Sequence, residues 1–183
     1  MSIRNEQRER VIALLSQHLL TTGLAQTSLR QLARAAGVSD RMLLYYFTDK
    51  AEVLAATMSA IAGQLVSGLA AALPEGTRLP PRDLALRAAS LTTGPEMRRF
   101  MRLWVEMVAA AAKNEEPYKA IVAQIMAGFR SWVDARLDLP EGTDRAAVAS
   151  ALIALIDGLA LVDICSETDM APRMAGALEA ILT

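Results

Sequence analysis

The sequence has little of the chemistry that catalysis and metal binding need. Its 183 residues include one histidine, His18, and one cysteine, Cys165, far apart in the chain. No group of His, Cys, Asp or Glu has metal-ligand spacing, and no glycine-rich loop matches a nucleotide-binding pattern. Because catalysis requires positioned acids, bases, nucleophiles or metals, we expect no catalytic residues, no metal, no cofactor and no enzymatic activity.

A disulfide framework and a secretory leader are also missing. A single cysteine cannot form an internal disulfide, and the N-terminal region has no basic segment followed by an apolar run and a cleavage site. Both absences predict a cytoplasmic protein.

Residues 146–165 are long and apolar enough to suggest a membrane span, but Asp157 lies near their centre, where a carboxylate is costly in lipid. We expect no membrane contact.

The chain as a whole lacks the surplus of positive charge that is typical of nucleic-acid binding. Its 19 Lys and Arg residues face 20 Asp and Glu residues, for a net charge of −1. The two parts differ, however. The first 54 residues hold seven basic and five acidic side chains, whereas the remainder holds 12 and 15. The N-terminal part is therefore the mildly basic one.

Signals for β-strands are absent as well. The chain has only 10 valines and 9 isoleucines, no segment shows sustained alternation of apolar and polar residues, and alanine and leucine dominate. Hydrophobic residues make up 53% of the chain, enough to bury a core without cross-links. The prediction is an all-α protein of about nine helices, covering residues 4–20, 28–36, 40–46, 50–73, 82–91, 96–113, 117–137, 143–165 and 171–182.

Two short helices within residues 29–46 are joined by a tight turn. Gly37 can adopt the positive φ that such a turn requires, and Ser28 and Ser39 can cap the helices. This is a helix-turn-helix pattern, in which the exposed second helix reads base edges and neighbouring hydroxyls and cations hold phosphates. Asp40 does not suit that role because a carboxylate repels phosphate. We expect an outward face of Arg41, Met42 and Tyr45 and an inward face of Leu43, Leu44 and Phe47.

A longer motif surrounds the turn. It consists of SLRQLARAAGVS at residues 28–39, LLYYF at 43–47 and DK at 49–50. As a whole it resembles the DNA-binding domain of the TetR family of transcriptional regulators. The resemblance implies a helix-turn-helix DNA-binding domain over residues 1–50 and a helical effector-binding and dimerisation domain over residues 51–183. Asp40, Arg41, Met42 and Leu44 depart from the family pattern, so no operator sequence carries over.

The resemblance also implies which residues touch DNA. Tyr46 and Lys50 match family positions that hold phosphates, although Tyr46 could simply pack and Lys50 could be solvated. Arg30 and Arg41 can reach phosphate or guanine. The candidate DNA-binding residues are therefore Ser28, Arg30, Ser39, Arg41, Met42, Tyr45, Tyr46 and Lys50.

One late helix is apolar around its whole circumference. Residues 146–156 carry no charge and only one polar side chain, Ser150. Such a helix must be covered on two sides, which favours a homodimer over a monomeric bundle with a central helix. The segment LIDGLA at residues 155–160 also resembles the part of TetR-family proteins where the dimer forms. The candidate interface residues are Leu152, Leu155, Ile156, Leu159, Met174 and Leu178.

The family resemblance implies an effector pocket in the second domain. Methionine and aromatic side chains leave adaptable space for an apolar or amphipathic small molecule, although any core uses them too. Glu106, Tyr118, Asp157 and Asp163 could orient a ligand, and Glu106 could instead pair with Arg102. The candidate ligand-binding residues are Met97, Met101, Trp104, Val108, Met126 and Phe129.

Together these features predict a ligand-responsive regulator, expected to be a repressor, that binds a palindromic site in double-stranded DNA as a homodimer. The effector would favour a dimer geometry with the wrong spacing of reading helices. Two alternatives stay open: a helical ligand-binding or protein-interaction module that no longer reads DNA, and a small helical enzyme. A steep salt dependence of DNA affinity would separate the regulator from the module.

Overall fold

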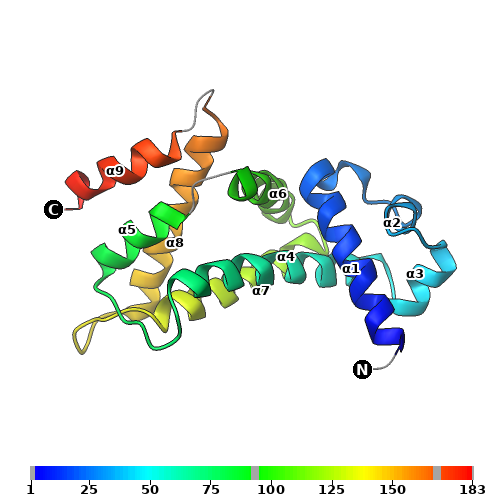
Figure 1. Cartoon of the computed structure of the whole chain (residues 1–183), viewed down its shortest axis with the longest axis horizontal. Helices are drawn as coiled ribbons and strands as arrows, with labels where there is room; N and C mark the ends of the chain where they lie inside the picture. Colours follow the sequence, from blue (N-terminus) through cyan, green and yellow to red (C-terminus); the bar gives the residue numbers. More distant parts are fainter. Residues whose placement is uncertain (1–2, 92–94, 167–169, 183) are drawn as a thin grey trace. The chain divides into compact units, whose positions relative to one another are not determined.

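The computed structural model describes residues 3–91, 95–166 and 170–182, and in this part of the chain the regular elements are all helices, with one isolated parallel bridge between Leu79 and Leu137 (Figure 1). The all-α prediction is confirmed, with helix bounds within three residues of those expected. A 3₁₀ turn, η1, was not predicted. The elements are α1 (Ile3–Thr22), η1 (Gly23–Gln26), α2 (Leu29–Ala35), α3 (Asp40–Tyr46), α4 (Lys50–Ala72), α5 (Pro81–Leu91), α6 (Pro95–Ala112), α7 (Tyr118–Asp134), α8 (Arg145–Ile164) and α9 (Ala171–Ile181).

The chain forms two compact units. The N-terminal unit comprises Met1–Leu65 and Arg102–Ile125, and the C-terminal unit comprises Val66–Met101 and Met126–Thr183. Helices α4, α6 and α7 each contribute to both units. The boundary at residue 50 between two functional domains therefore stays a prediction, since compactness alone divides the chain elsewhere.

Local sequence signals explain how the N-terminal unit places α2 and α3. The Ser28 hydroxyl accepts a hydrogen bond from the Gln31 N–H at 3.3 Å, and the Ser28 N–H donates one to the Gln31 Oε1 at 3.1 Å, which makes a capping box. Gly37 has φ +67°, and the N–H of Val38 then donates to the Ala33 carbonyl at 3.0 Å. The inward side chains of α2 and α3 form one core with those of α1. Its buried residues include Val11, Leu15, Leu19, Leu32, Leu43 and Phe47.

The C-terminal unit is built around α5, α8 and α9, which contact one another. Its core includes Leu73, Leu84, Leu137 and Ala149. At the far end of α8, the Arg98 guanidinium lies 2.8 Å from Asp163, and Asp163 also accepts a hydrogen bond from the Met170 N–H at 2.8 Å. This ion pair joins α6, α8 and the start of α9 within the unit.

Helix α8 is covered on one side only. Its buried residues, Ala149, Ile153, Ala160 and Asp163, follow one stripe, whereas Leu161 and Val162 are 44% and 49% exposed. By length and composition alone α4 and α8 could span a membrane, a test that core helices of soluble proteins also pass. Only 22% of the apolar window of α8 is buried, so most of its apolar surface is open in this chain.

Candidate nucleic-acid interface

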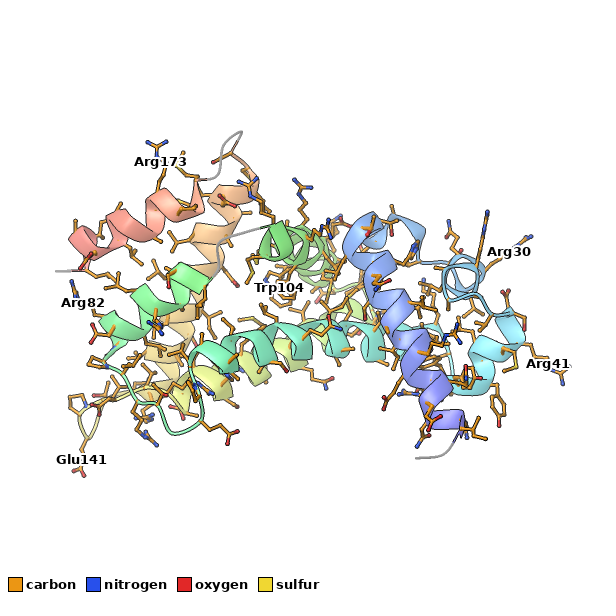
Figure 2. The ribbon with its side chains drawn as sticks, in the orientation of Figure 1. Arg30, Arg41, Arg82, Trp104, Glu141 and Arg173 are labelled. Carbon is orange, nitrogen blue, oxygen red and sulfur yellow. The ribbon has the colours of Figure 1, made fainter. Side chains whose placement is uncertain are left out.

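The helix-turn-helix presents the predicted DNA-binding side chains to solvent. Tyr46 is half-buried, and the other seven are exposed. Figure 2 shows Arg30 on α2 and Arg41 on α3, both pointing away from α1. The structure thus places a cation on each helix of the motif, with Lys50 exposed at the start of α4.

The two predicted N-cap serines do act as caps. The Ser39 hydroxyl accepts a hydrogen bond from the Met42 N–H at 3.2 Å, and Ser28 forms the capping box described above. Capping uses one lone pair of the Ser39 hydroxyl and leaves its proton for a further hydrogen bond, whereas the Ser28 hydroxyl also donates to the Gln31 Oε1 at 2.5 Å. A phosphate contact by either serine stays a prediction.

Leu44 does not point inward, contrary to the sequence prediction. It is 44% exposed, whereas Leu43 and Phe47 are 0% and 2% exposed. Successive helix residues are 100° apart, and α3 has only seven residues. Leu43 and Phe47 face the core, so the side chain of Leu44, the next residue after Leu43, is rotated away from the core. Leu44 therefore joins Met42 and Tyr45 on the exposed surface.

Tyr45 is held in place by neighbours that the sequence did not reveal. The Arg4 guanidinium donates to the Tyr45 carbonyl at 3.0 Å and lies 4.9 Å from the centre of its ring. The Tyr46 ring meets Tyr45 edge to face, with centres 5.4 Å apart. Arg4 and Tyr45 are 41 residues apart, so no local periodicity could link them. Arg4 is a positioning residue for Tyr45, the most exposed of the large hydrophobic side chains of α3.

A second arginine of α1 fixes the segment between α3 and α4. The Arg8 guanidinium lies 3.2 Å from the Glu52 carboxylate and 4.7 Å from the centre of the Phe47 ring. Glu52 also accepts a hydrogen bond from the Thr48 N–H at 2.6 Å. This backbone hydrogen bond is the main cause that lowers the pKa of Glu52 below its usual 4.5, followed by a hydrogen bond from the Thr48 side chain and, to a smaller extent, by Arg8.

The network predicts a pH-dependent contribution of Glu52 to stability. Because folding lowers the pKa of Glu52, its ionised form stabilises the protein above pH 4.5, and this stabilisation is lost as the pH falls through the folded-state pKa. The stability advantage of the wild type over Glu52→Gln should therefore be present at neutral pH and disappear in acid. Urea unfolding at both pH values measures it, with Glu141→Gln, an exposed acid before α8, as the control for loss of one charge. An advantage independent of pH would contradict the prediction.

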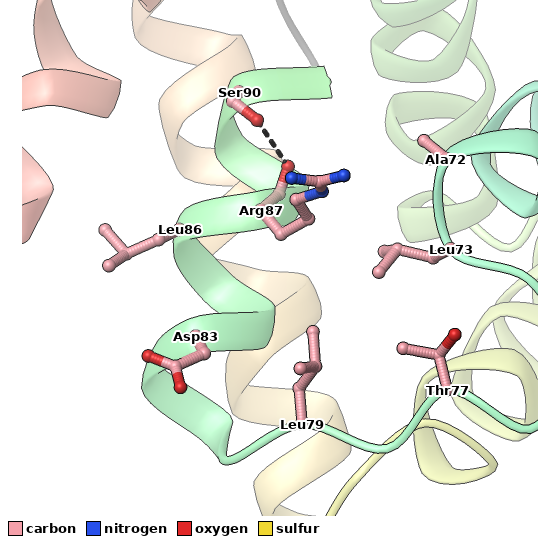
Figure 3. A pocket seen from close by; sticks show the side chains of 8 residues that line it. All are labelled: Ala72, Leu73, Thr77, Leu79, Asp83, Leu86, Arg87 and Ser90. Carbon is pink, nitrogen blue, oxygen red and sulfur yellow. Dashed lines mark hydrogen bonds between the residues drawn. The ribbon is translucent and has the colours of Figure 1, made fainter.

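The six candidate effector residues lie on α6 and α7 with varied burial. Met101 and Trp104 are buried, Met97, Met126 and Phe129 are half-buried, and Val108 is 39% exposed. None of them borders the hollow of about 520 Å³ in the C-terminal unit, which lies between the end of α4 and α5 (Figure 3). The effector site stays a prediction.

Two acids considered as ligand-orienting groups have structural partners. Glu106 accepts a hydrogen bond from the Leu24 N–H at 2.7 Å, at the turn after α1. Asp163 is 3% exposed and paired with Arg98. In the part of the chain that the structure describes, no three His, Cys, Asp or Glu side chains gather as a metal site.

The candidate interface residues differ in how far they are open to a partner. Leu152, Leu155, Ile156, Leu159 and Met174 are half-buried, whereas Leu178 is 3% exposed and belongs to the core of its own chain. The exposed side of α8, called its open side below, carries small residues along most of its length and larger apolar residues near its C-terminal end. These residues are Ala147, Ala151, Ala154, Gly158, Leu161 and Val162.

Comparison with known proteins agrees with this geometry. Residues 17–57 match the family described as "Bacterial regulatory proteins, tetR family", and residues 84–182 match "BetI-type transcriptional repressor, C-terminal". The HTH-type transcriptional regulator PksA of Bacillus subtilis is 28% identical over 87% of this chain and 80% of its own. The regulator BetI of Paraburkholderia xenovorans is 31% identical over 80% of this chain and 77% of its own.

Solved structures show the same fold. A TetR-family regulator from Rhodococcus sp. has a TM-score of 0.76 at 21% identity, over 98% of this chain and 100% of its own. The multidrug-binding protein EbrR, complexed with proflavin, has a TM-score of 0.64 at 22% identity, over 97% and 99%. Fold and site define a DNA-binding helix-turn-helix protein. The chain belongs to the TetR family and is a BetI-like transcriptional regulator, a family of regulators rather than enzymes.

Proposed function

We propose that the protein is a homodimeric repressor that binds a palindromic operator and changes its DNA affinity when a small organic molecule binds. Each protomer would place α3 in one of two successive major grooves, about 34–36 Å apart. The observation that carries the proposal is the exposed face of α3, where Arg41, Met42 and Tyr45 project from a helix anchored by Leu43 and Phe47.

The proposed DNA contacts fall into two groups. Arg41 can donate two hydrogen bonds to a guanine edge, and Met42 and Tyr45 can lie against neighbouring bases. Arg30 on α2, Tyr46 at the end of α3 and Lys50 at the start of α4 can hold phosphates. The Ser39 hydroxyl can donate as well, and the Ser28 hydroxyl can do so in exchange for its hydrogen bond to Gln31. Phosphate contacts by two protomers would make the affinity fall steeply with salt.

The open side of α8 supports the homodimer. Ala147, Ala151, Ala154 and Gly158 lie on one exposed stripe and allow close approach of a second helix, while Leu161 and Val162 add apolar area at its end. The same stripe on a second copy would meet it across a two-fold axis. We propose that Leu152, Leu155, Ile156, Leu159 and Met174 border this interface and that Leu178 supports it from within.

A small organic effector is supported by the ligand in a structural neighbour. EbrR binds proflavin, a compact aromatic compound, and the BetI-type C-terminal match covers α6 and α7 here. We propose Met97, Met101, Trp104, Val108, Met126 and Phe129 as the residues that contact an apolar or amphipathic effector. By binding one dimer geometry better than another, it would shift the spacing of the two α3 helices. Such a regulator works in the cytoplasm.

Selection of bound fragments from random duplex DNA by the purified protein tests the proposal. The wild type should enrich a palindrome whose half-sites are one helical turn apart, and the Arg41→Ala, Tyr45→Ala double variant should enrich none. Arg130→Ala, an exposed arginine on α7, is the matched control and should enrich the same palindrome. A folded wild-type protein that enriches no sequence at low salt would overturn the proposal and favour a ligand-binding module.

A further inference from the structure

The exposed face of α3 is rich in apolar side chains. Met42, Leu44 and Tyr45 are 41%, 44% and 57% exposed, and they account for three of the nine large hydrophobic side chains exposed in the described part of the chain. All three belong to a helix of seven residues. Met42 and Leu44 are about 200° apart on the helix and lie on opposite flanks of Tyr45, so apolar side chains border both sides of the surface that α3 would present to a partner.

The same helix has few groups that can read bases by hydrogen bonding. It contains no Asn or Gln, the residues that pair with adenine, and its donors on the exposed face are the Arg41 guanidinium and the Tyr45 hydroxyl. Arg41 suits guanine. An A·T pair offers one further feature in the major groove, the 5-methyl group of thymine, and apolar side chains recognise it.

Charge around this surface favours DNA as the partner. Arg30 on α2, Arg41 on α3 and Lys50 at the start of α4 are all exposed, so each of these three helices presents a cation that a phosphate could meet. The Tyr45 ring also has neighbours within its own chain, the Arg4 guanidinium 4.9 Å from its centre and the Tyr46 ring edge to face, which favour the observed orientation. A ring with a favoured orientation loses less conformational freedom when it packs against a base.

We infer that Met42, Leu44 and Tyr45 read thymine through its 5-methyl group, so that the operator specificity of this protein rests on methyl contacts beside one guanine contact from Arg41. The inference rests on the proposed function. It makes Leu44 a specificity-determining residue.

Uracil substitution tests the inference, because deoxyuridine differs from thymidine only by the missing methyl. The probe is the palindrome that the protein itself selects from random DNA, with each thymine replaced in turn by uracil in both half-sites. We expect about a fourfold loss of affinity for each contacted methyl, the equivalent of about 0.8 kcal/mol for one buried methylene-sized group. Binding titrations at fixed salt measure the loss.

Variants identify the side chain responsible. Leu44→Ala and Met42→Ala should bind the thymine and uracil operators more equally than the wild type does, at different positions of the half-site. Val105→Ala removes an exposed apolar side chain from α6 and should keep the full discrimination of the wild type. Circular dichroism confirms that each variant is folded.

The outcomes separate the inference from the function on which it rests. Loss on uracil substitution that Leu44→Ala or Met42→Ala abolishes supports methyl readout. Equal affinity of the wild type for thymine and uracil operators, or a selected half-site without thymine, overturns the inference and leaves the regulator intact. Failure to select any operator would overturn both.

Discussion

Replacing Arg136 by methionine should lower the free energy of unfolding by about 3 kcal/mol, because hydrogen bonds to charged groups are worth about 1.5–3 kcal/mol each. Arg136 is 4% exposed. Its Nε donates to the Leu73 carbonyl at 2.9 Å and its Nη1 to the Trp132 carbonyl at 3.1 Å. These carbonyls lie just after α4 and in the last turn of α7, where the helix dipoles favour a cation. Urea unfolding followed by circular dichroism measures the loss.

Two matched variants show whether the buried hydrogen bonds cause the loss. Arg130→Met removes an exposed arginine from α7, the helix that ends just before Arg136, and should change stability by less than about 0.5 kcal/mol. Arg136→Lys keeps the charge but not the planar guanidinium, which lies 4.0 Å from the centre of the Trp132 ring, so it should fall between wild type and Arg136→Met. A loss no larger than that of Arg130→Met would show that water replaces the guanidinium at little cost.

Features fixed by neighbouring residues were predictable from the sequence. Ser28 and Ser39 cap the helices they were expected to cap, and α3 has the expected bounds, Asp40–Tyr46. Caps, turn glycines and apolar periodicity act over a few residues, so one sequence is enough to locate them. The exposed positions of Arg41, Met42 and Tyr45 follow from the same periodicity.

Features that depend on distant residues were not predictable. Arg4 with Tyr45 and Glu106 with Leu24 join positions 41 and 82 residues apart, and no spacing in the sequence marks either pair. The exposure of Leu44 was missed for another reason. A leucine in an apolar run is expected to be buried, but Leu43 and, just after the helix, Phe47 occupy the inward side of α3, and Leu44 lies 100° away from Leu43.

Replacing Gly23 by alanine should destabilise the protein by about 2–3 kcal/mol, of which about 1–2 kcal/mol comes from the left-handed backbone. Gly23 has φ +65° at the turn that follows α1. A Cβ atom there would also overlap the Glu106 carboxylate, whose Oε2 would lie only 2.7 Å away. The carboxylate would have to move and would then lose its hydrogen bond from the Leu24 N–H. Thermal and urea unfolding measure the total.

A double-mutant cycle divides this loss between backbone and carboxylate. Glu106→Ala removes both the overlap and the hydrogen bond, so Gly23→Ala in that background should cost only the backbone part, about 1–2 kcal/mol. Glu106→Gln keeps an acceptor oxygen for Leu24 and a side chain of the same size, and Gly23→Ala should keep its full cost there. Equal costs in all three backgrounds would show that Gly23 serves the turn alone. A smaller cost with Glu106→Ala would show that α6, through Glu106, holds the turn between α1 and the helix-turn-helix.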